Sequence, residues 1–156
     1  MKIWKHIDPQ HIVLDAPSGQ KHAVLRFVAD RFAENGILAD PASFLAGLLE
    51  REAVMSTGIG GGIAIPHAVG EDVTRGVVML MRLEAAVDFE AIDGVPVDLI
   101  LGLALPAGDT GLHLRLLAGI SRLCKNPEFL NAVRTARNSQ TLFSTLKALE
   151  ESMPFH

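Results

Sequence analysis

His67 is the residue whose type and position most clearly suit chemistry. It follows the glycine-rich segment Ser56-Thr57-Gly58-Ile59-Gly60-Gly61-Gly62, the short apolar run Ile63-Ala64-Ile65, and Pro66. Proline fixes its own φ and biases the preceding residue toward extended geometry, so we expect His67 just beyond a short strand. Neutral imidazole, with a pKa of about 6.5, is a competent nucleophile near neutral pH. The plainer interpretation is an ordinary surface histidine.

The glycine-rich segment is predicted to be an irregular loop, because glycine loses much backbone entropy on ordering. Its backbone N–H groups could line a concave anion site next to His67. It does not match the nucleotide-binding motifs, since Ile63 follows Gly62 where a Walker loop needs lysine and a dinucleotide fingerprint needs glycine or alanine. It also runs from a helix into a strand, the reverse of both motifs. The alternative is a long helix-to-strand connection.

A carboxylate could orient the His67 ring. Glu71 or Asp72, four and five residues further on, could accept a hydrogen bond from one ring nitrogen. That bond would fix the tautomer that leaves the other nitrogen free to attack. This pairing is the arrangement that nucleophilic histidines generally need.

Two further residues suit an anion site. His113 is predicted in the first turn of a helix capped by Asp109 or Thr110, where unpaired N–H groups and the helix dipole favour negative charge. A polar residue on the solvent side of an amphipathic helix is the plainer interpretation. Arg51 could clamp a phosphate, or it could simply be a cation in the last turn of its helix.

Metal chemistry is not predicted. None of the six histidines forms a His-x-x-x-His pair, and the single cysteine, Cys124, has no CxxC partner. Cys124 closes an apolar stripe and is predicted to lie in the core. One cysteine cannot form an internal disulfide, which suits a reducing compartment. The remaining histidines are predicted to be solvated or terminal: His6, His11, His22 and His156.

The elements that position these residues follow from hydrophobic periodicity. Helices are predicted from Ser18, as the N-cap, to Gly36 and from Asp40 to Glu52, and in the last third around Leu112–Leu123, Pro127–Val133 and Ser139–Leu149. The continuous apolar runs Gly76–Leu83 and Val97–Leu105 are typical of strands covered on both faces. We therefore expect one α/β domain spanning residues 1–156, a three-layer helix/sheet/helix sandwich with a mixed central sheet.

Composition excludes several classes of protein. The chain has 156 residues, 49% of them hydrophobic and 21% charged, which is ample for a packed core and unlike a disordered chain. Its 14 Lys and Arg against 18 Asp and Glu give a net charge of -4, so a nucleic-acid partner is not expected. The most apolar run, Val97–Pro106, is too short to cross a bilayer. We expect a cytoplasmic protein without direct membrane insertion.

Three segments together resemble a known family. Arg51-Glu52 with Ser56 through His67 resembles the active-site signature of the fructose, mannitol and nitrogen-type enzyme IIA proteins of the phosphoenolpyruvate-dependent phosphotransferase system (PTS). Phe89-Glu90-Ala91-Ile92-Asp93-Gly94-Val95-Pro96-Val97-Asp98-Leu99 is similar to a segment of the fructose and nitrogen branch. His113-Leu114, followed by Leu116-Leu117, is similar to the helix that carries the family's second histidine.

The resemblance implies a role for each site residue. His67 would be the phosphorylated histidine, His113 its neighbour, Arg51 a basic group next to it and Glu71 the carboxylate that follows. The loop around the phosphoryl group would comprise Thr57, Gly58, Gly60, Gly61 and Gly62. No metal, nucleotide or other cofactor is implied. Val69 stands where the family often has Lys, Arg or Thr, which removes one donor.

The resemblance also implies partners and three functional hypotheses. The donor would be HPr or its nitrogen-branch paralogue, and acidic residues outnumber basic ones between Glu71 and Asp109, which could form a negative rim for a basic donor. The first hypothesis is a phosphocarrier with a nitrogen-type regulatory output onto a protein target. The alternative is a sugar-transport enzyme IIA that passes phosphate to an enzyme IIB. The third is a degenerate module that binds partners without being phosphorylated.

Overall fold

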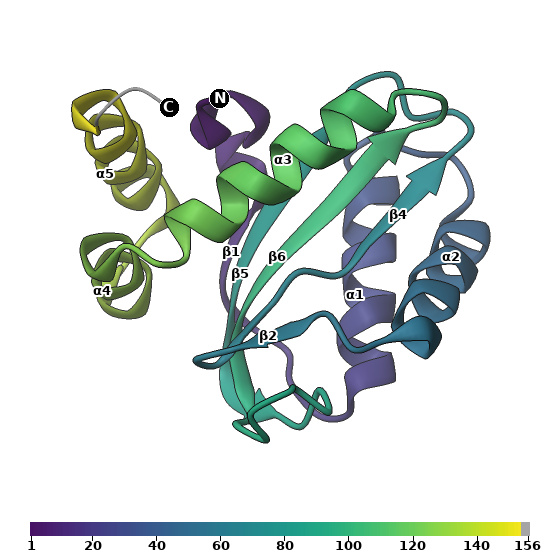
Figure 1. Cartoon of the computed structure of the whole chain (residues 1–156), viewed down its shortest axis with the longest axis horizontal. Helices are drawn as coiled ribbons and strands as arrows, with labels where there is room; N and C mark the ends of the chain where they lie inside the picture. Colours follow the sequence, from purple (N-terminus) through teal and green to yellow (C-terminus); the bar gives the residue numbers. More distant parts are fainter. Residues whose placement is uncertain (154–156) are drawn as a thin grey trace.

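The chain folds into three layers around a mixed six-stranded sheet (Figure 1). The computed structural model describes residues 1–153. Helices α1 and α2 cover one face of the sheet, and α3, α4 and α5 cover the other. The predicted helix/sheet/helix sandwich with a mixed sheet is therefore confirmed. His156 lies outside the described residues.

The helices and strands alternate irregularly along the chain. The helical segments are η1 (Ile3–His6), η2 (Pro9–His11), α1 (Lys21–Glu34), α2 (Pro41–Val54), α3 (Thr110–Leu123), α4 (Pro127–Thr135) and α5 (Ser139–Ser152). The strands are β1 (Ile12–Ala16), β2 (Gly58–Gly60), β3 (Ile63–Ala64), β4 (His67–Gly70), β5 (Val77–Val87) and β6 (Val97–Pro106).

The sheet order is β1-β5-β6-β3-β2, with β4 also paired to β6. Strands β5 and β6 are antiparallel, whereas β1 runs parallel to β5 and both β3 and β4 run parallel to β6. Ala64 lies opposite Ile100 and His67 opposite Leu103, so β3 and β4 follow one another along the same side of β6. Beyond β3, strand β4 is therefore the free edge of the sheet.

Alternate residues of β6 belong to two different hydrophobic cores, one on each face of the sheet. Ile100 and Ala104 pack with α1 and α2, while Leu101 and Leu103 pack with α3, α4 and α5. A strand buried on both faces is nearly all apolar, as the run Val97–Leu105 predicts. Cys124 is buried in the second core, which confirms its predicted place.

Side-chain caps define most helix starts. The Asp40 carboxylate accepts from the Ser43 N–H at 3.1 Å, and the Asp109 carboxylate accepts from the Leu112 N–H at 3.1 Å, as predicted. The first helix differs, because it begins at Lys21 with Gln20 as an N-cap that makes no side-chain hydrogen bond. The prediction of Ser18 as its cap is wrong.

The N-terminal segment is part of the core, which the sequence did not indicate. Strand β1 pairs with β5, more than sixty residues away, with Ile12 opposite Leu80. His11 immediately precedes β1 and is 0% exposed, packed against the ring of Phe32 at a centroid distance of 5.4 Å. The prediction that His11 is solvated is wrong, whereas His22 is exposed as expected. No helix among residues 1–153 is long and apolar enough to span a bilayer.

Candidate active site

His67 begins the free edge strand β4 rather than following the end of a strand. Pro66 interrupts the edge only briefly, since β3 ends at Ala64 and β4 begins at His67 on the same flank of β6. Successive strand residues face opposite sides. Ala68 packs toward α1 and α2, so His67 faces the side of the sheet that carries α3. Its ring is half-buried.

The ring of His67 is oriented by a backbone carbonyl. Its Nδ1 lies 2.8 Å from the Ile65 carbonyl oxygen. A carbonyl can only accept, so Nδ1 carries the proton and Nε2 keeps its lone pair. The prediction that a carboxylate from Glu71 or Asp72 fixes the tautomer is therefore wrong; Asp72 instead accepts from the Ala39 N–H at 2.6 Å.

Burial and two neighbouring basic residues favour the neutral form of this ring. Burial lowers the pKa of His67, and the charges of Arg51 and His113 lower it further; the Ile65 hydrogen bond and the charge of Glu52 act in the opposite direction. The balance is a pKa below 6.5. A neutral imidazole with an unprotonated Nε2 is the nucleophilic state of histidine.

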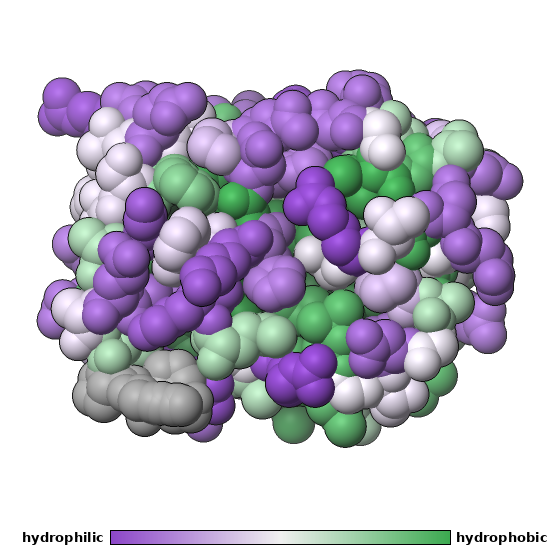
Figure 2. All heavy atoms as spheres, turned by 90° about the horizontal axis from the view of Figure 1, so that it is seen from above, coloured by the Kyte–Doolittle hydropathy of each residue, from purple (hydrophilic) through white to green (hydrophobic). Residues whose placement is uncertain are grey.

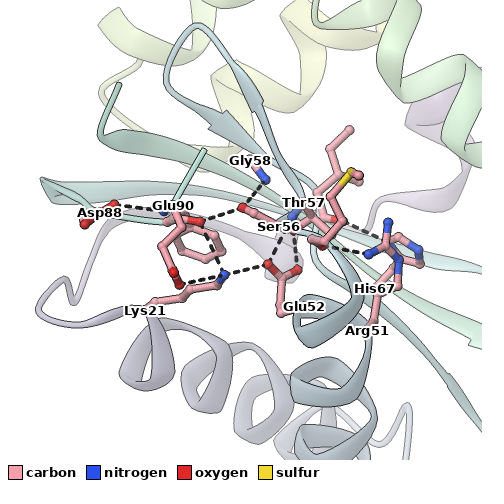
Figure 3. Close-up of polar contacts among 12 residues, drawn as sticks. Lys21, Arg51, Glu52, Ser56, Thr57, Gly58, His67, Asp88 and Glu90 are labelled. Carbon is pink, nitrogen blue, oxygen red and sulfur yellow. Dashed lines mark hydrogen bonds and ion pairs between the residues drawn. The ribbon is translucent and has the colours of Figure 1, made fainter. Parts of the chain in front are cut away.

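Arg51 approaches His67 from the end of α2 (Figure 3). Its guanidinium donates to the Met55 carbonyl oxygen at 2.8 Å, which satisfies a carbonyl near the helix end. The two interpretations of Arg51 are thus compatible, because one nitrogen caps the helix while the group as a whole lies near the imidazole. The side chain is only partly buried and retains other N–H donors.

His113 approaches from α3. It lies in the first turn of the helix, as predicted, and is half-buried. Its Nε2 lies 3.0 Å from the carbonyl oxygen of Pro106, the last residue of β6, so Nε2 is the protonated nitrogen. This bond ties the start of α3 to the end of the strand beside β4. Sheet, α2 and α3 thus each contribute one basic residue to the site.

Glu71 lies outside this group of residues. It is exposed in the turn after β4 and lines a hollow of about 380 Å³ beside the start of α2, together with Asp40 and Asp72. Within the described residues, the structure gives no contact between Glu71 and His67. Of the acidic residues predicted to form a rim, Asp98 pairs with Arg134.

The glycine-rich segment is a β-hairpin, not an irregular loop. Gly58 pairs with Ala64 and Gly60 with Ile63 in antiparallel register, and the hairpin turns through Gly61 and Gly62, both with positive φ. The turn points away from His67, from which Gly62 is separated along the edge by roughly 16 Å of extended chain. The predicted wrapping of a phosphoryl group by Gly60, Gly61 and Gly62 is therefore not the geometry observed.

Side chains from elsewhere hold the hairpin turn. The Gly61 N–H donates to the Asp93 carboxylate at 3.0 Å, and the Gly61 carbonyl accepts from Arg134 at 3.0 Å. Arg134 also pairs with Asp98 at 3.1 Å. Hydrogen bonds from the Gly61 and Val95 N–H groups lower the pKa of Asp93. The Asp93 carboxylate therefore already accepts from the Gly61 N–H that a bound anion would need.

A buried polar network lies behind the site, and sequence reasoning missed it (Figure 3). The Glu52 carboxylate accepts from both the N–H and the hydroxyl of Thr57, at 3.0 and 2.5 Å, and pairs with Lys21 at 3.0 Å. Its signal in the sequence was a charged residue on a buried stripe, because Glu52 continues the four-residue spacing of Phe44 and Leu48.

The other two residues of the predicted phosphate loop, Thr57 and Gly58, already make hydrogen bonds within the protein. The Thr57 N–H and hydroxyl are taken by Glu52, and its carbonyl accepts from the Ile65 N–H at 3.0 Å. The Gly58 N–H donates to the Ser56 hydroxyl at 3.0 Å. Thr57 and Gly58 therefore shape the segment that leads to His67.

Apolar side chains are exposed on the same elements that carry the site. Figure 2 shows a mostly hydrophilic surface on which hydrophobic residues emerge in separate patches. Val54 and Met55 at the end of α2, Val69 on β4 and Leu114 beside His113 are all exposed. Among residues 1–153, no three His, Cys, Asp or Glu side chains gather in a way that could hold a metal ion.

Comparison with known proteins gives consistent matches. The family model described as phosphoenolpyruvate-dependent sugar phosphotransferase system, EIIA 2, matches residues 5–149. The chain is 33% identical over 143 residues to a nitrogen regulatory protein of Pseudomonas aeruginosa, covering 92% of this chain and 93% of the relative. It is 31% identical over 140 residues to a fructose-specific PTS EIIA component of Haloferax volcanii, covering 90% and 91%. The solved structure of the nitrogen regulatory protein IIA-Ntr from Neisseria meningitidis superposes with a TM-score of 0.84 at 29% identity, covering 92% and 98%.

Proposed function

The chain belongs to the EIIA 2 family of the phosphoenolpyruvate-dependent sugar phosphotransferase system, and we propose that His67 is the residue on which it carries the phosphoryl group. Proteins of this family are phosphocarriers. The observation that carries the assignment is the state of one ring: Nδ1 donates to the Ile65 carbonyl, which leaves Nε2 unprotonated beside two basic residues.

The proposed step is an in-line displacement at phosphorus. Nε2 of His67 forms a bond to phosphorus as the phosphorus–nitrogen bond of a donor phosphohistidine breaks, and the donor imidazole leaves with that electron pair. The proton on Nδ1 of His67 stays in place throughout and remains hydrogen-bonded to Ile65. The donor is HPr or its nitrogen-branch paralogue. Such a transfer depends mainly on positioning and electrostatics.

Charge stabilisation falls to Arg51 and His113. A phosphoryl group brings nearly two negative charges, and the Arg51 charge that disfavours imidazolium also favours this group. The Nε2–H of His113 donates to the Pro106 carbonyl oxygen. His113 therefore acts through its position near the His67 ring and at the N-terminus of α3, where the helix dipole favours negative charge. Glu71 and the hairpin turn have no part in the proposed step.

A protein donor fits the surroundings of His67. The ring lies on a free edge strand, and the elements that carry the site also carry exposed apolar residues: Val54 and Met55 at the end of α2, Val69 on β4 and Leu114 on α3. Exposed apolar groups beside a polar site are typical of protein-binding surfaces. Val69 has the same facing as His67, two residues along β4, and offers no donor of its own.

We favour a nitrogen-type regulatory output, in which phosphorylation of His67 changes binding to a regulatory protein. The similarity to nitrogen regulatory proteins supports it. The similarity to a fructose-specific component supports the alternative, transfer from His67 to an enzyme IIB. Incubating the phosphorylated protein with an enzyme IIB separates the two, because only the transport role predicts rapid loss of phosphate to that acceptor.

The test of the phosphocarrier site is intact-mass spectrometry after incubation with phosphoenolpyruvate, enzyme I and HPr or its paralogue. We expect one acid-labile phosphate on the wild type and none on His67→Ala. His22→Ala, at an exposed position on α1, is the matched control and should be phosphorylated like the wild type. A full equivalent of phosphate on His67→Ala would refute the assignment. No phosphate on the wild type with either donor would favour the degenerate binding module.

A further inference from the structure

A continuous chain of contacts leads from a buried ion pair to the His67 ring (Figure 3). It begins at Lys21 on α1, whose ammonium lies 3.0 Å from the Glu52 carboxylate. Glu52 holds Thr57, the Thr57 carbonyl accepts from the Ile65 N–H, and the Ile65 carbonyl accepts from Nδ1 of His67. Every link is a hydrogen bond or ion pair between neighbouring groups.

We infer that Glu52 is a positioning residue for His67: its buried carboxylate fixes Thr57 and Ile65, so that the Ile65 carbonyl holds the imidazole in the tautomer with a free Nε2. Glu52 does not touch the ring. This inference rests on the proposed role of His67 and assigns the group that maintains its reactive state.

The burial of Glu52 supports a positioning role rather than a surface ion pair. Its side chain is 5% exposed, and that of Lys21 is 17% exposed. A carboxylate removed from water is costly unless its oxygens are satisfied. Here Oε1 accepts from Lys21 and the Thr57 N–H, and Oε2 accepts from the Thr57 hydroxyl. The carboxylate thus has a definite position, and so has Thr57.

The segment between Thr57 and Ile65 needs such an anchor. It contains the flexible glycines of the hairpin, and the pairing of the Ile65 N–H with the Thr57 carbonyl closes its base at 3.0 Å. The far end is held separately, by Asp93 and Arg134 at the turn. Without Glu52, the base would be held by backbone pairing and by the Ser56 hydroxyl, which donates to the Phe89 carbonyl at 2.5 Å.

The first test compares Glu52→Gln with Glu50→Gln, an exposed residue on the same helix. Glutamine keeps the size of glutamate but removes the charge and one acceptor. In Glu52→Gln we expect phosphoryl uptake by His67 to slow by about tenfold to a hundredfold, the scale of misplaced reacting groups. Glu50→Gln should retain the wild-type rate.

The second readout is one that a merely structural role would not change. Long-range proton–nitrogen NMR on the unphosphorylated protein reports the His67 tautomer directly. We expect a single tautomer, protonated on Nδ1, in the wild type and in Glu50→Gln, and a mixture in Glu52→Gln. A folded Glu52→Gln protein with the wild-type tautomer and rate would overturn the inference.

A second pair of variants covers the case in which Glu52→Gln does not fold. Thr57→Val removes the hydroxyl that donates to Glu52, and Thr57→Ser keeps it. A tautomer mixture in Thr57→Val but not in Thr57→Ser supports the inference, and identical spectra refute it. Because the tautomer is measured without any donor protein, absence of phosphorylation in the wild type would refute the proposed function while leaving this test decisive.

Discussion

At the scale of single residues, the proposed site combines the half-buried imidazole of His67 with the nearby guanidinium of Arg51. Burial and the charge of Arg51 lower the pKa of His67, which keeps Nε2 available at neutral pH. The same cation favours an arriving phosphoryl group. Arg51 therefore has two effects on one ring, and they can be measured separately.

Replacing Arg51 with methionine tests both effects. Because the guanidinium charge lowers the pKa of His67, Arg51→Met should raise that pKa toward the ordinary value of 6.5, as followed by NMR titration of the ring. Phosphoryl uptake should slow by about a hundredfold, the scale for losing one preorganised donor. Arg26→Met, at an exposed position on α1, is the control. An unchanged titration curve would contradict the placement of Arg51 beside the ring.

At the scale of elements, the glycine hairpin and the site are distinct parts of one edge. The hairpin turn is held by Asp93 and Arg134, at the end of the edge remote from His67. Strand β4 begins with His67 farther along that edge, opposite Leu103. Gly61 and Gly62 form the turn with positive φ, and the Gly61 N–H is already occupied by the Asp93 carboxylate.

The turn can be tested with two alanine substitutions. Gly61 and Gly62 both have positive φ, which costs a non-glycine residue about 1–2 kcal/mol. A Cβ at Gly62 would lie 2.9 Å from the Asp98 carboxylate, whereas one at Gly61 meets nothing within 4 Å. We expect both variants to lower the free energy of unfolding in urea, Gly62→Ala by the larger amount.

Phosphoryl uptake provides the second half of this test. Because the turn lies far from His67, Gly61→Ala and Gly62→Ala should both be phosphorylated at the wild-type rate under conditions where they are folded. A folded Gly61→Ala protein with strongly impaired uptake would restore the hypothesis that the turn surrounds the phosphoryl group.

At the scale of the whole molecule, the N-terminal segment contributes to both hydrophobic cores, with Ile12 in one and Ala16 in the other. Strand β1 adds an edge to β5, and His11 at its start is enclosed against α1. Burial lowers the pKa of His11; the charge of Asp8 raises it, and those of Arg75 and Arg31 lower it. Neither ring nitrogen has a hydrogen-bond partner among the described residues.

This burial predicts a pH dependence of stability. Below about pH 6.5 His11 is protonated in the unfolded chain, whereas its lowered pKa keeps it neutral in the folded chain. The unfolded state then binds more protons, so the free energy of unfolding decreases as the pH is lowered. His67, whose pKa is also lowered, contributes with the same sign. In urea unfolding between about pH 8 and pH 5, His11→Leu should lose less stability than the wild type. Equal losses would show that His11 is protonated without cost in the fold.

The sequence alone predicted the features that depend on local pattern. Apolar periodicity and caps such as Asp40 and Asp109 located most helices and both long strands, because burial of a face and satisfaction of helix ends are encoded within a few residues. The motif around His67 and the placement of His113 in a first helical turn were likewise local. These observations were sufficient for the layered fold and for the family.

Only the tertiary structure decided the features that depend on distant partners. Glu52 pairs with Lys21 on another helix, β1 pairs with β5, and Arg134 holds the hairpin turn. Each of these contacts joins residues that are far apart in the sequence, so no single segment predicts it. The acceptor that sets the His67 tautomer is a backbone carbonyl, which no residue type reveals. Sequence pattern determines what each element buries, whereas packing between elements determines which polar groups meet.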